Sequence, residues 1–249
     1  MNASVEPQRL DLALVARGLV ATRAKARDLI ARGEVRVDGE VAQKPAMNVR
    51  EDQAIAVDAQ AAAQVSRGAV KLAAALDRFQ LDTAGRVALD IGASTGGFTQ
   101  VLLERGVTRV YAVDVGKGQL HASLTSDPRV VSLEECDART LDRALVPEAI
   151  DAIVADVSFI SVRKVLTAAL ALAAPGCWLV ALVKPQFEVG REGVGKGGIV
   201  RDAALREEAL ADVREWLAAQ AGWSVVGDMP SPIEGGSGNV EFLLVGVRT

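Results

Sequence analysis

The sequence of 249 residues predicts an α/β protein with an open, doubly wound sheet, preceded by a small α+β module. Three observations predict this fold. Short apolar runs alternate with helical patterns from residue 67 onward, as in a sheet covered by helices. Several of these runs end in a charged residue, and the first runs into a glycine-rich turn. Residues 8–58 instead combine two short helical patterns with a β-hairpin signal.

The N-terminal module is expected to span residues 1–58. Apolar positions at helical spacing predict a first helix from Arg9, and a second is expected over residues 23–32, with Thr22 as its N-cap. Alternation over residues 34–41, around an Asp-Gly pair, predicts a β-hairpin.

Bases dominate the middle of this module. The second helix places Arg23 and Arg27 four positions apart on one face, where a cationic surface can meet a phosphate backbone. A solvated helix face without a ligand is the alternative. The bases from residue 17 to residue 36 are Arg17, Arg23, Lys25, Arg27, Arg32 and Arg36.

The order of residues in the module resembles the S4 RNA-binding domain. The resemblance rests on Arg9-Leu-Asp, Gly18-Leu, Thr22-Arg-Ala-Lys-Ala, Leu29-Ile, Gly33, Val35-Arg-Val-Asp-Gly39 and Lys44-Pro45. It implies that the module docks RNA. The resemblance and the basic pattern together predict which residues contact RNA. The candidates in the module and in the segment that follows it are Arg9, Arg23, Lys25, Arg27, Lys44 and Arg67.

Residues 59–66 are expected to be a linker, and residues 67–249 the sheet domain. A helix is expected over residues 67–80 and a second, the clearest, over residues 201–219. The expected strands lie near residues 87–90, 109–114, 129–133, 151–156, 177–183, 223–228 and 240–247. The last two are expected to form an antiparallel hairpin.

An apolar run over residues 165–183 is as long as a membrane span. Pro175-Gly176 interrupts it, and Lys184-Pro185 follows at once. A buried helix, a turn and a central strand are therefore expected, and not a membrane segment.

The first strand runs into Asp90-Ile-Gly-Ala-Ser-Thr-Gly-Gly97, whose glycines let a ligand approach the backbone closely. The next strand ends at Asp114, and an acid there can bind both hydroxyls of a ribose. The spacing lacks the middle glycine of a dinucleotide motif, and Asp90 would repel a pyrophosphate but suits a cationic amino group. The pattern favours S-adenosylmethionine over NAD, with a tight turn that binds no ligand as the alternative.

Four charged residues stand at the ends of elements of the sheet domain. Asp156 and Lys184 each end an apolar strand, Lys71 lies in the first helix, and Glu241 lies in the last strand pair. A lysine that loses water deprotonates more readily, and a second ammonium nearby favours the neutral amine further. A helix cap is an alternative role for Asp156, and a surface charge is the alternative for any one of the four.

These four residues match the Lys-Asp-Lys-Glu tetrad of ribose 2′-O-methyltransferases related to FtsJ (RrmJ). Three further phrases resemble the TlyA family: Asp90-Ile-Gly-Ala-Ser-Thr-Gly-Gly-Phe-Thr, Ala155-Asp-Val-Ser-Phe-Ile-Ser, and the segment from Val183 to Val200. With the S4-like module, the resemblance covers nearly the whole chain. It implies a class I methyltransferase fold and transfer of a methyl group from S-adenosylmethionine to a cytidine 2′-hydroxyl of ribosomal RNA.

The resemblance also implies a role for each residue. Lys184 would be the base or acceptor for the 2′-hydroxyl, Asp156 would orient it, Lys71 would favour its neutral form, and Glu241 would position Lys71 or the ribose. Relatives carry Glu-Arg-Thr-Asn where this chain has Glu134-Glu-Cys-Asp137, and Asp137 can still accept from an adenine amino group. The expected cofactor contacts are Asp90, Gly92, Ala93, Ser94, Thr95, Gly96, Gly97, Phe98, Asp114, Val115 and Asp137.

The segment from Gly190 to Lys196 matches most of a phosphate-binding Walker loop, but Gly197 stands where Ser or Thr would hold magnesium. It is expected to be a loop over the active site, whose Arg191 and Lys196 contact RNA. One histidine and two cysteines without metal spacing predict no zinc site and reduced thiols.

The partner implied is ribosomal RNA or a ribosomal subunit; a net charge of −4 argues against broad nucleic-acid binding but allows a local basic patch. The N-terminus lacks a signal-peptide pattern, so a cytoplasmic location is expected. The sequence leaves the oligomeric state open. Three other functions remain: a membrane-active haemolysin, a non-catalytic RNA-binding factor, and a methyltransferase of base nitrogens, which Val157-Ser158 in place of two prolines disfavours.

Overall fold

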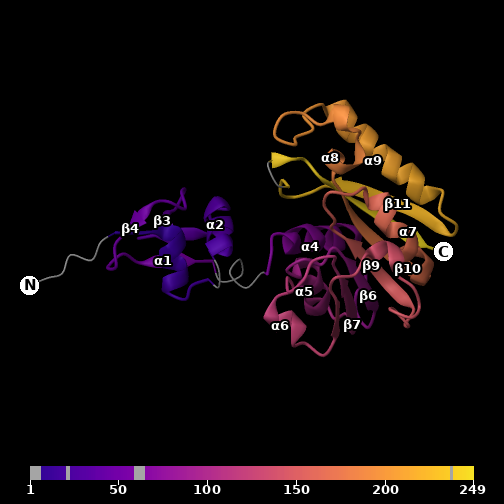
Figure 1. Ribbon diagram of the computed structural model, residues 1–249, viewed down its shortest axis with the longest axis horizontal. Coiled ribbons are helices and arrows are strands. Elements are labelled where there is room, and N and C mark those ends of the chain that lie inside the picture. Colours follow the sequence, from indigo (N-terminus) through magenta and orange to yellow (C-terminus); the bar gives the residue numbers. More distant parts are fainter. Residues whose placement is uncertain (1–6, 21–22, 59–64, 236–237) are drawn as a thin grey trace, which may run out of the picture. The chain divides into compact units, whose positions relative to one another are not determined.

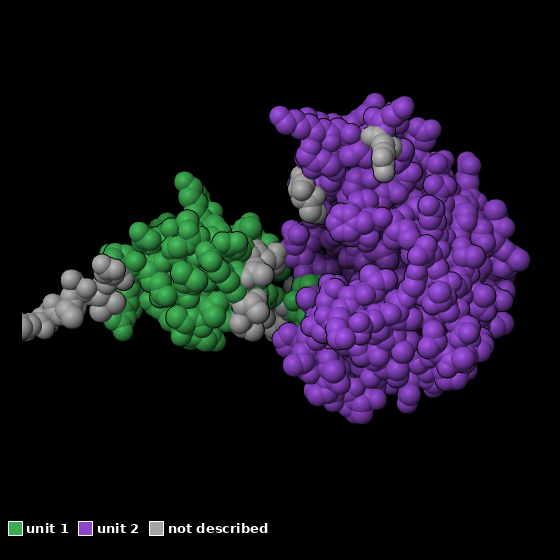
Figure 2. All heavy atoms as spheres, in the orientation of Figure 1, with its two compact units in different colours: residues 1–66 green, residues 67–249 purple. Residues whose placement is uncertain are grey.

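The computed structural model describes residues 7–20, 23–58, 65–235 and 238–249. The chain divides into two compact units, an N-terminal unit, Met1–Ser66, and a sheet unit, Arg67–Thr249 (Figures 1 and 2). Thr22 and most of the expected linker, residues 59–64, lie outside the described residues.

In the described residues of the N-terminal unit, two helices pack on each other, together with two small sheets. Its core is formed by fully buried apolar side chains such as Leu10, Leu14 and Leu29. One sheet has the order β3-β2-β5, and β1 pairs with β4. The elements are β1 (Gln8–Arg9), α1 (Leu10–Ala16), α2 (Arg23–Ala31), β2 (Val35–Val37), β3 (Glu40–Val41), β4 (Asn48–Val49) and β5 (Ile55–Val57).

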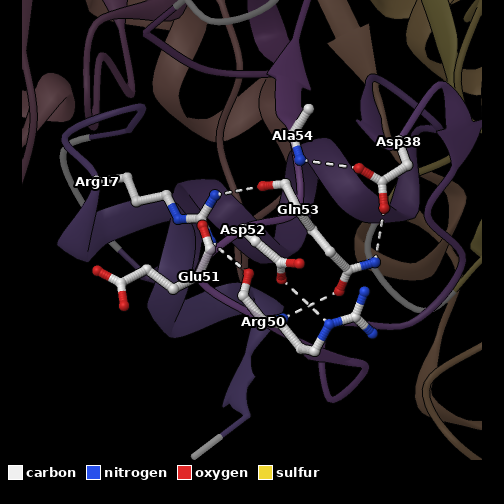
Figure 3. Close-up of polar contacts among 7 residues, drawn as sticks. All are labelled: Arg17, Asp38, Arg50, Glu51, Asp52, Gln53 and Ala54. Carbon is white, nitrogen blue, oxygen red and sulfur yellow. Dashed lines mark hydrogen bonds and ion pairs between the residues drawn. The ribbon is translucent and has the colours of Figure 1, made fainter. Parts of the chain in front are cut away.

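A network of polar contacts fixes the turn before β5 (Figure 3). The Arg17 guanidinium, at the end of α1, donates to the carbonyl oxygens of Gln53 at 2.7 Å and Arg50 at 2.8 Å. The Asp38 carboxylate accepts from the Ala54 N–H at 2.8 Å and from the Gln53 amide at 2.7 Å. Arg17 therefore ties the turn to the helix, and Asp38 ties it to the β2–β3 hairpin.

The sheet unit is built on a seven-stranded sheet of order β11-β12-β10-β9-β6-β7-β8. The strands from β10 to β8 are parallel, and β12 pairs antiparallel with both β10 and β11. This is the predicted doubly wound sheet with an antiparallel hairpin at its end. The strands are β6 (Val87–Ile91), β7 (Arg109–Val113), β8 (Val130–Leu133), β9 (Ile150–Ala155), β10 (Ala173–Val183), β11 (Trp223–Pro230) and β12 (Phe242–Arg248).

Helices cover the sheet in two groups, because α4 packs against α5 whereas α7 packs against α9 (Figure 1). The central strands β6, β7, β9 and β10 are buried along most of their length, which explains their near-continuous apolar sequences, whereas the edge strand β8 is only partly buried. The helices are α4 (Gly68–Phe79), α5 (Gly97–Glu104), α6 (Ala122–Thr125), α7 (Val162–Leu172), α8 (Pro185–Glu188) and α9 (Ala203–Ala218), with short 3-10 turns η1 (Ala138–Thr140) and η2 (Arg191–Gly193).

The prediction of a turn at Pro175-Gly176 between a helix and a strand is wrong. Strand β10 begins at Ala173 and runs through both residues, with a register shift against β9 between Ala173 and Trp178. Gly176 takes φ of +79° within this irregular stretch. The two breaker residues therefore produce a bulge in the longest strand of the sheet. No helix in the described part of the chain has the length and apolar character needed to cross a membrane.

The strand order reverses between β6 and β9, which are direct parallel neighbours. In such sheets a crevice opens beyond the carboxyl ends of the strands at this point. Ile91 pairs with Ala155 at the end of the two strands, so the glycine turn after β6 and Asp156 after β9 emerge side by side.

Candidate active site

A cavity of about 500 Å³ lies at the carboxyl ends of β6, β7 and β9. Three carboxylates line it, those of Asp114, Asp137 and Asp156, and Arg139 carries the only positive charge among the described lining residues. The remaining wall is largely apolar and includes Val115, Val157, Phe159 and Ile160.

The glycine turn after β6 brings the backbone close to β9. A Cβ added at Gly92 would lie 2.5 Å from the Asp156 carbonyl oxygen, and Gly92 has φ of +78°. No other residue type fits this position without displacing Asp156. Gly96, with φ of +97°, then forms the N-cap of α5.

The Asp114 carboxylate organises the turn from the neighbouring strand. It accepts from the Ser94 N–H at 2.8 Å and from the Gly116 N–H at 2.7 Å. The Ser94 hydroxyl donates to the Gln119 side chain, which also lines the cavity. Asp114 thus joins the loops that follow β6 and β7.

Glu134, which follows β8, holds the second of these loops. Its carboxylate accepts from the backbone N–H groups of Gly118 at 2.8 Å, Gln119 at 2.6 Å and Leu120 at 3.1 Å. These contacts, the one from Leu120 first, lower the pKa of Glu134. The sequence presents Glu134 only as part of a motif. Its partners are backbone N–H groups, and these leave no pattern of residue types in the sequence.

Asp137 has a partner that the sequence did not predict. The Arg139 Nε donates to its carboxylate at 2.9 Å, and the Arg139 backbone N–H donates at 2.9 Å as well. The hydrogen bond from the Arg139 side chain is the main cause that lowers the pKa of Asp137 to about 2. An anionic Asp137 therefore stands at the cavity wall beside a guanidinium.

The structure separates the expected cofactor contacts into two groups. Gly92, Ser94, Asp114, Val115 and Asp137 line the cavity. The others lie outside its lining: Asp90, Ala93, Thr95, Gly96, Gly97 and Phe98.

Asp90 and Phe98 are the members of the second group whose side chains are most enclosed. Phe98 is buried within α5. Asp90 is fully buried, accepts from the Thr99 hydroxyl at 2.6 Å, and keeps a second oxygen without a partner among the described residues.

The four charged residues at element ends form two ion pairs. The Lys184 Nζ lies 2.6 Å from the Asp156 carboxylate and 2.9 Å from the Ser158 hydroxyl. The Lys71 Nζ, in the first turn of α4, lies 2.5 Å from the Glu241 carboxylate. A Cβ at Gly235 would clash with the Glu241 carboxylate, so glycine there makes room for the second pair.

Strand pairing brings the two ion pairs together. Val183 pairs with Phe242 in the antiparallel ladder of β10 and β12, so Lys184 and Glu241 are the next residues across that ladder. Asp156 is likewise one residue beyond the last paired position of β9. The structure therefore gathers Lys71, Asp156, Lys184 and Glu241 at one edge of the sheet.

Phe159 is an exposed aromatic residue at the cavity. Its side chain is 91% exposed, its φ is +68°, and its ring centroid lies 5.3 Å from that of Phe187. Bulky residues rarely adopt such a backbone conformation, so the loop holds the ring outward at a cost in strain. In the sequence, Phe159 stands out only as part of the segment Asp156-Val-Ser-Phe159.

The glycine-rich loop after Lys184 is fastened to the segment that carries Glu241. Asn239 is buried, accepts from the Val200 N–H at 3.2 Å and donates to the Gly198 carbonyl at 2.9 Å. Lys196 is exposed on this loop, whereas the side chain of Arg191 lies outside the described part.

The expected RNA contacts of the N-terminal unit differ in their surroundings. Arg9, Arg23 and Arg27 all contact the buried Asp11. Lys44 is exposed, as is Arg67, the residue before α4 in the sheet unit, and Lys25 is half-buried. The predicted cationic face of Arg23 and Arg27 therefore includes a buried carboxylate, that of Asp11, to which both arginines are bound.

The strand order and the acid-lined cavity at the switch point define a class I methyltransferase fold. The sequence matches the FtsJ-like methyltransferase family over residues 64–248 and the S4 domain over residues 8–55. It is 49% identical to the 16S/23S rRNA (cytidine-2′-O)-methyltransferase TlyA of Mycobacterium tuberculosis, over 95% of this chain and 88% of that protein. The chain belongs to the TlyA family of FtsJ-like methyltransferases.

Two solved structures are similar as well. A protein of Streptococcus thermophilus, described as a candidate hemolysin, aligns with a TM-score of 0.76 at 39% identity, over 98% of this chain and 90% of that one. A Burkholderia thailandensis N1-methyltransferase with bound S-adenosylhomocysteine aligns with a TM-score of 0.51 at 22% identity, over 74% of this chain and 77% of that one. The latter likeness shows the fold alone.

Proposed function

We propose that this protein transfers a methyl group from S-adenosylmethionine to the ribose 2′-hydroxyl of a cytidine in ribosomal RNA. The observation that carries the proposal is the Lys184–Asp156 pair at the cavity, with the Lys71–Glu241 pair beside it across the β10–β12 ladder. The activity named for the Mycobacterium tuberculosis relative supports the same reaction.

The cavity residues suit the proposed cofactor. Three carboxylates against one guanidinium favour a cationic ligand over a pyrophosphate. Asp114 would bind the ribose hydroxyls, Asp137 the adenine amino group, and the Gly92 turn the methionine part, because no side chain fills that space. Bound S-adenosylmethionine supplies an electrophilic methyl group on a sulfonium.

The proposed chemistry of the chain is to hold and deprotonate a hydroxyl. Lys184 Nζ accepts the hydrogen bond, and then the proton, of the 2′-hydroxyl. Asp156 holds that amine in place and balances its charge once it is protonated. Lys71 would favour the neutral form of Lys184, and Glu241, next to Lys184 across the β10–β12 ladder, would position Lys71 or the ribose. Most of the acceleration is expected from positioning, since a sulfonium methyl is already reactive.

Phe159 is the proposed platform for the target base. An aromatic ring that is 91% exposed beside the cavity can stack on a nucleobase turned out of the RNA. The S4 domain would dock the RNA through Arg9, Arg23, Lys25, Arg27 and Lys44, with Arg67, Arg191 and Lys196 as further contacts. We place the protein in the cytoplasm, with its ribosomal substrate.

The experiment that tests the proposal is transfer of labelled methyl from S-adenosylmethionine to small and large ribosomal subunits that lack the modification. Wild type is compared with Lys184→Ala and with Lys164→Ala, which removes an exposed lysine of α7 in the same unit. Label on a ribose, lost in Lys184→Ala and kept in Lys164→Ala, supports the reaction and identifies the subunit.

Two other outcomes overturn parts of the proposal. Equal activity of Lys184→Ala would remove Lys184 from the chemistry. Absence of transfer by a wild type that binds S-adenosylmethionine would reject ribosomal RNA as substrate and favour the non-catalytic RNA-binding factor. Leakage of dye from liposomes, measured on the same preparation, tests the haemolysin function suggested for the Streptococcus thermophilus relative.

A further inference from the structure

Asp11 lies at the centre of three arginines in the N-terminal unit. Its side chain is 0% exposed, and its carboxylate accepts from the Nε of Arg9 at 3.0 Å, Arg23 at 2.9 Å and Arg27 at 3.1 Å. The three arginine side chains are 40%, 45% and 52% exposed, so each reaches from the buried acid to the surface. We call these four residues the Asp11 cluster.

The cluster is stable only as a unit. A carboxylate without water is costly unless charged donors surround it, and here three guanidinium groups do so. The hydrogen bond from Arg9 is the largest cause that holds the pKa of Asp11 well below its ordinary value, and Arg23 and Arg27 lower it further. The cluster therefore keeps its acid ionised and carries a net charge of +2.

The contacts leave the arginines able to bind a second acceptor. A guanidinium has five N–H donors. Arg9 donates to Asp11 through Nε at 3.0 Å and through one terminal nitrogen at 3.1 Å, and Arg23 and Arg27 donate through Nε, so each of these contacts leaves terminal N–H groups for another acceptor. A free arginine loses much rotamer freedom when it grips a phosphate, whereas one already anchored loses less. An anchored set of three is thus suited to an anion with several oxygens.

We infer that Asp11 is a positioning residue that holds Arg9, Arg23 and Arg27 as a preformed receptor for a phosphodiester of RNA. The inference rests on the proposed function for its ligand and adds to it a residue that binds no RNA itself. Asp11 lowers the net positive charge that the RNA meets. Its contribution to binding must therefore come from the positions in which it holds the three arginines.

Because Asp11 is negative, its charge and its positioning role predict opposite changes in RNA affinity when it is replaced. Asp11→Asn removes a negative charge from the RNA-facing unit, so electrostatics alone predicts tighter binding. If Asp11 positions the arginines, the variant binds more weakly, because one amide oxygen cannot anchor three guanidinium groups and the amide N–H₂ repels them.

The same unit offers matched controls (Figure 3). Asp38→Asn makes the identical charge change, but Asp38 accepts from Gln53 and Ala54 and from none of the clustered arginines. Asp38 has φ of +51°, a conformation that asparagine tolerates well. For the arginines, Arg50→Lys is the control, since the Arg50 Nε contacts Asp52 at 3.1 Å and that acid is 75% exposed.

The experiment measures binding of the full-length chain to 23S ribosomal RNA transcribed in vitro, by filter binding at several salt concentrations. Asp11→Asn and Arg23→Lys are each expected to bind about 5-fold or more weakly, as for the loss of charge-assisted contacts. Asp38→Asn is expected to bind at least as tightly as wild type, and Arg50→Lys equally tightly. Circular dichroism melts establish that each variant is folded.

The outcomes separate the inference from the function on which it rests. Asp11→Asn that binds as tightly as wild type or more tightly overturns the positioning role. Should Asp11→Asn not fold, Arg23→Lys decides, because it keeps the charge on an exposed side chain; binding equal to wild type overturns the inference. A wild type without affinity for the RNA overturns the proposed RNA docking itself, and the positioning role with it.

Discussion

Lys71 and Glu241 are 170 positions apart in the chain, yet the Lys71 ammonium lies 2.5 Å from the Glu241 carboxylate. Their side chains are only 8% and 2% exposed. The contact joins the first turn of α4 to the segment that enters β12, next to Lys184. A buried pair of this kind is costly to break and much less costly to replace as a whole.

The Lys71–Glu241 pair allows stability and catalysis to be separated. Lys71→Met alone leaves a buried carboxylate unpaired and is expected to lower the free energy of unfolding by about 3–5 kcal/mol. Lys71→Met combined with Glu241→Leu is expected to recover most of that loss and to remain inactive in methyl transfer. Urea unfolding and the methyl-transfer assay measure the two effects. An active double variant would show that the pair only supports the fold.

Gly92 is expected to be essential for the cofactor site. In Gly92→Ala the new methyl group would lie 2.5 Å from the Asp156 carbonyl oxygen, so the glycine turn and Asp156 must move apart. Binding of S-adenosylhomocysteine, measured by calorimetry, should be lost. Gly176→Ala is the control, because Gly176 has nearly the same φ, +79°, lies outside the cavity lining, and a Cβ there meets nothing within 4 Å. Equal affinities of the two variants would contradict this account.

Much of the sheet unit is readable from sequence because its signals are local. Each parallel strand is an apolar run, and Asp114, Asp156 and Lys184 mark where three of them end. Pro175-Gly176 misled because β10 pairs with β9 at Ala173, before the breaker, and again from Trp178, after it, so the strand continues across an irregular stretch. Tertiary pairing of this kind has no signature in the sequence of one segment.

The candidate site is likewise predictable from the sequence only where its signals are local. The tetrad and the glycine turn are patterns of residue types at element ends, and a family resemblance carries them. The roles of Glu134 and Asp11 depend on which N–H groups surround a carboxylate after folding, so the sequence presents them as ordinary acids. Arg139 likewise becomes part of the cavity only through its contact with Asp137.

Glu134 is expected to support cofactor affinity through the loop that it holds. Glu134→Gln keeps one acceptor oxygen for three backbone N–H groups, so the loop with Gln119 should loosen and the affinity for S-adenosylhomocysteine fall about 10-fold. The neighbouring Glu135→Gln is the control, because the Glu135 side chain is 62% exposed and its partner Lys117 is 77% exposed. If both variants bind alike, the clamp has no part in cofactor binding.

Phe159 is expected to act on RNA and not on stability. Phe159→Ala removes a ring that is 91% exposed, so the unfolding free energy should change by less than about 0.5 kcal/mol. Loss of a stacked base costs about 1–3 kcal/mol, which predicts a rise in KM for the ribosomal substrate of about 5-fold or more. Val226→Ala, which shortens a side chain 51% exposed on β11, should leave KM unchanged. An unaltered KM in Phe159→Ala would remove the stacking role.

Asp90 gives the folded protein a pH dependence of known sign. Burial is the main cause that raises its pKa to about 7, with Asp156 and Asp114 adding to it against the Thr99 hydrogen bond. Between about pH 4 and 7 the unfolded chain releases a proton that the folded chain keeps, so stability falls as pH rises through this window. Wild type should therefore lose about 2–3 kcal/mol relative to Asp90→Asn between pH 5 and pH 8, as measured by urea unfolding. A constant difference between the two proteins over this range would mean that the Asp90 carboxyl does not titrate within it.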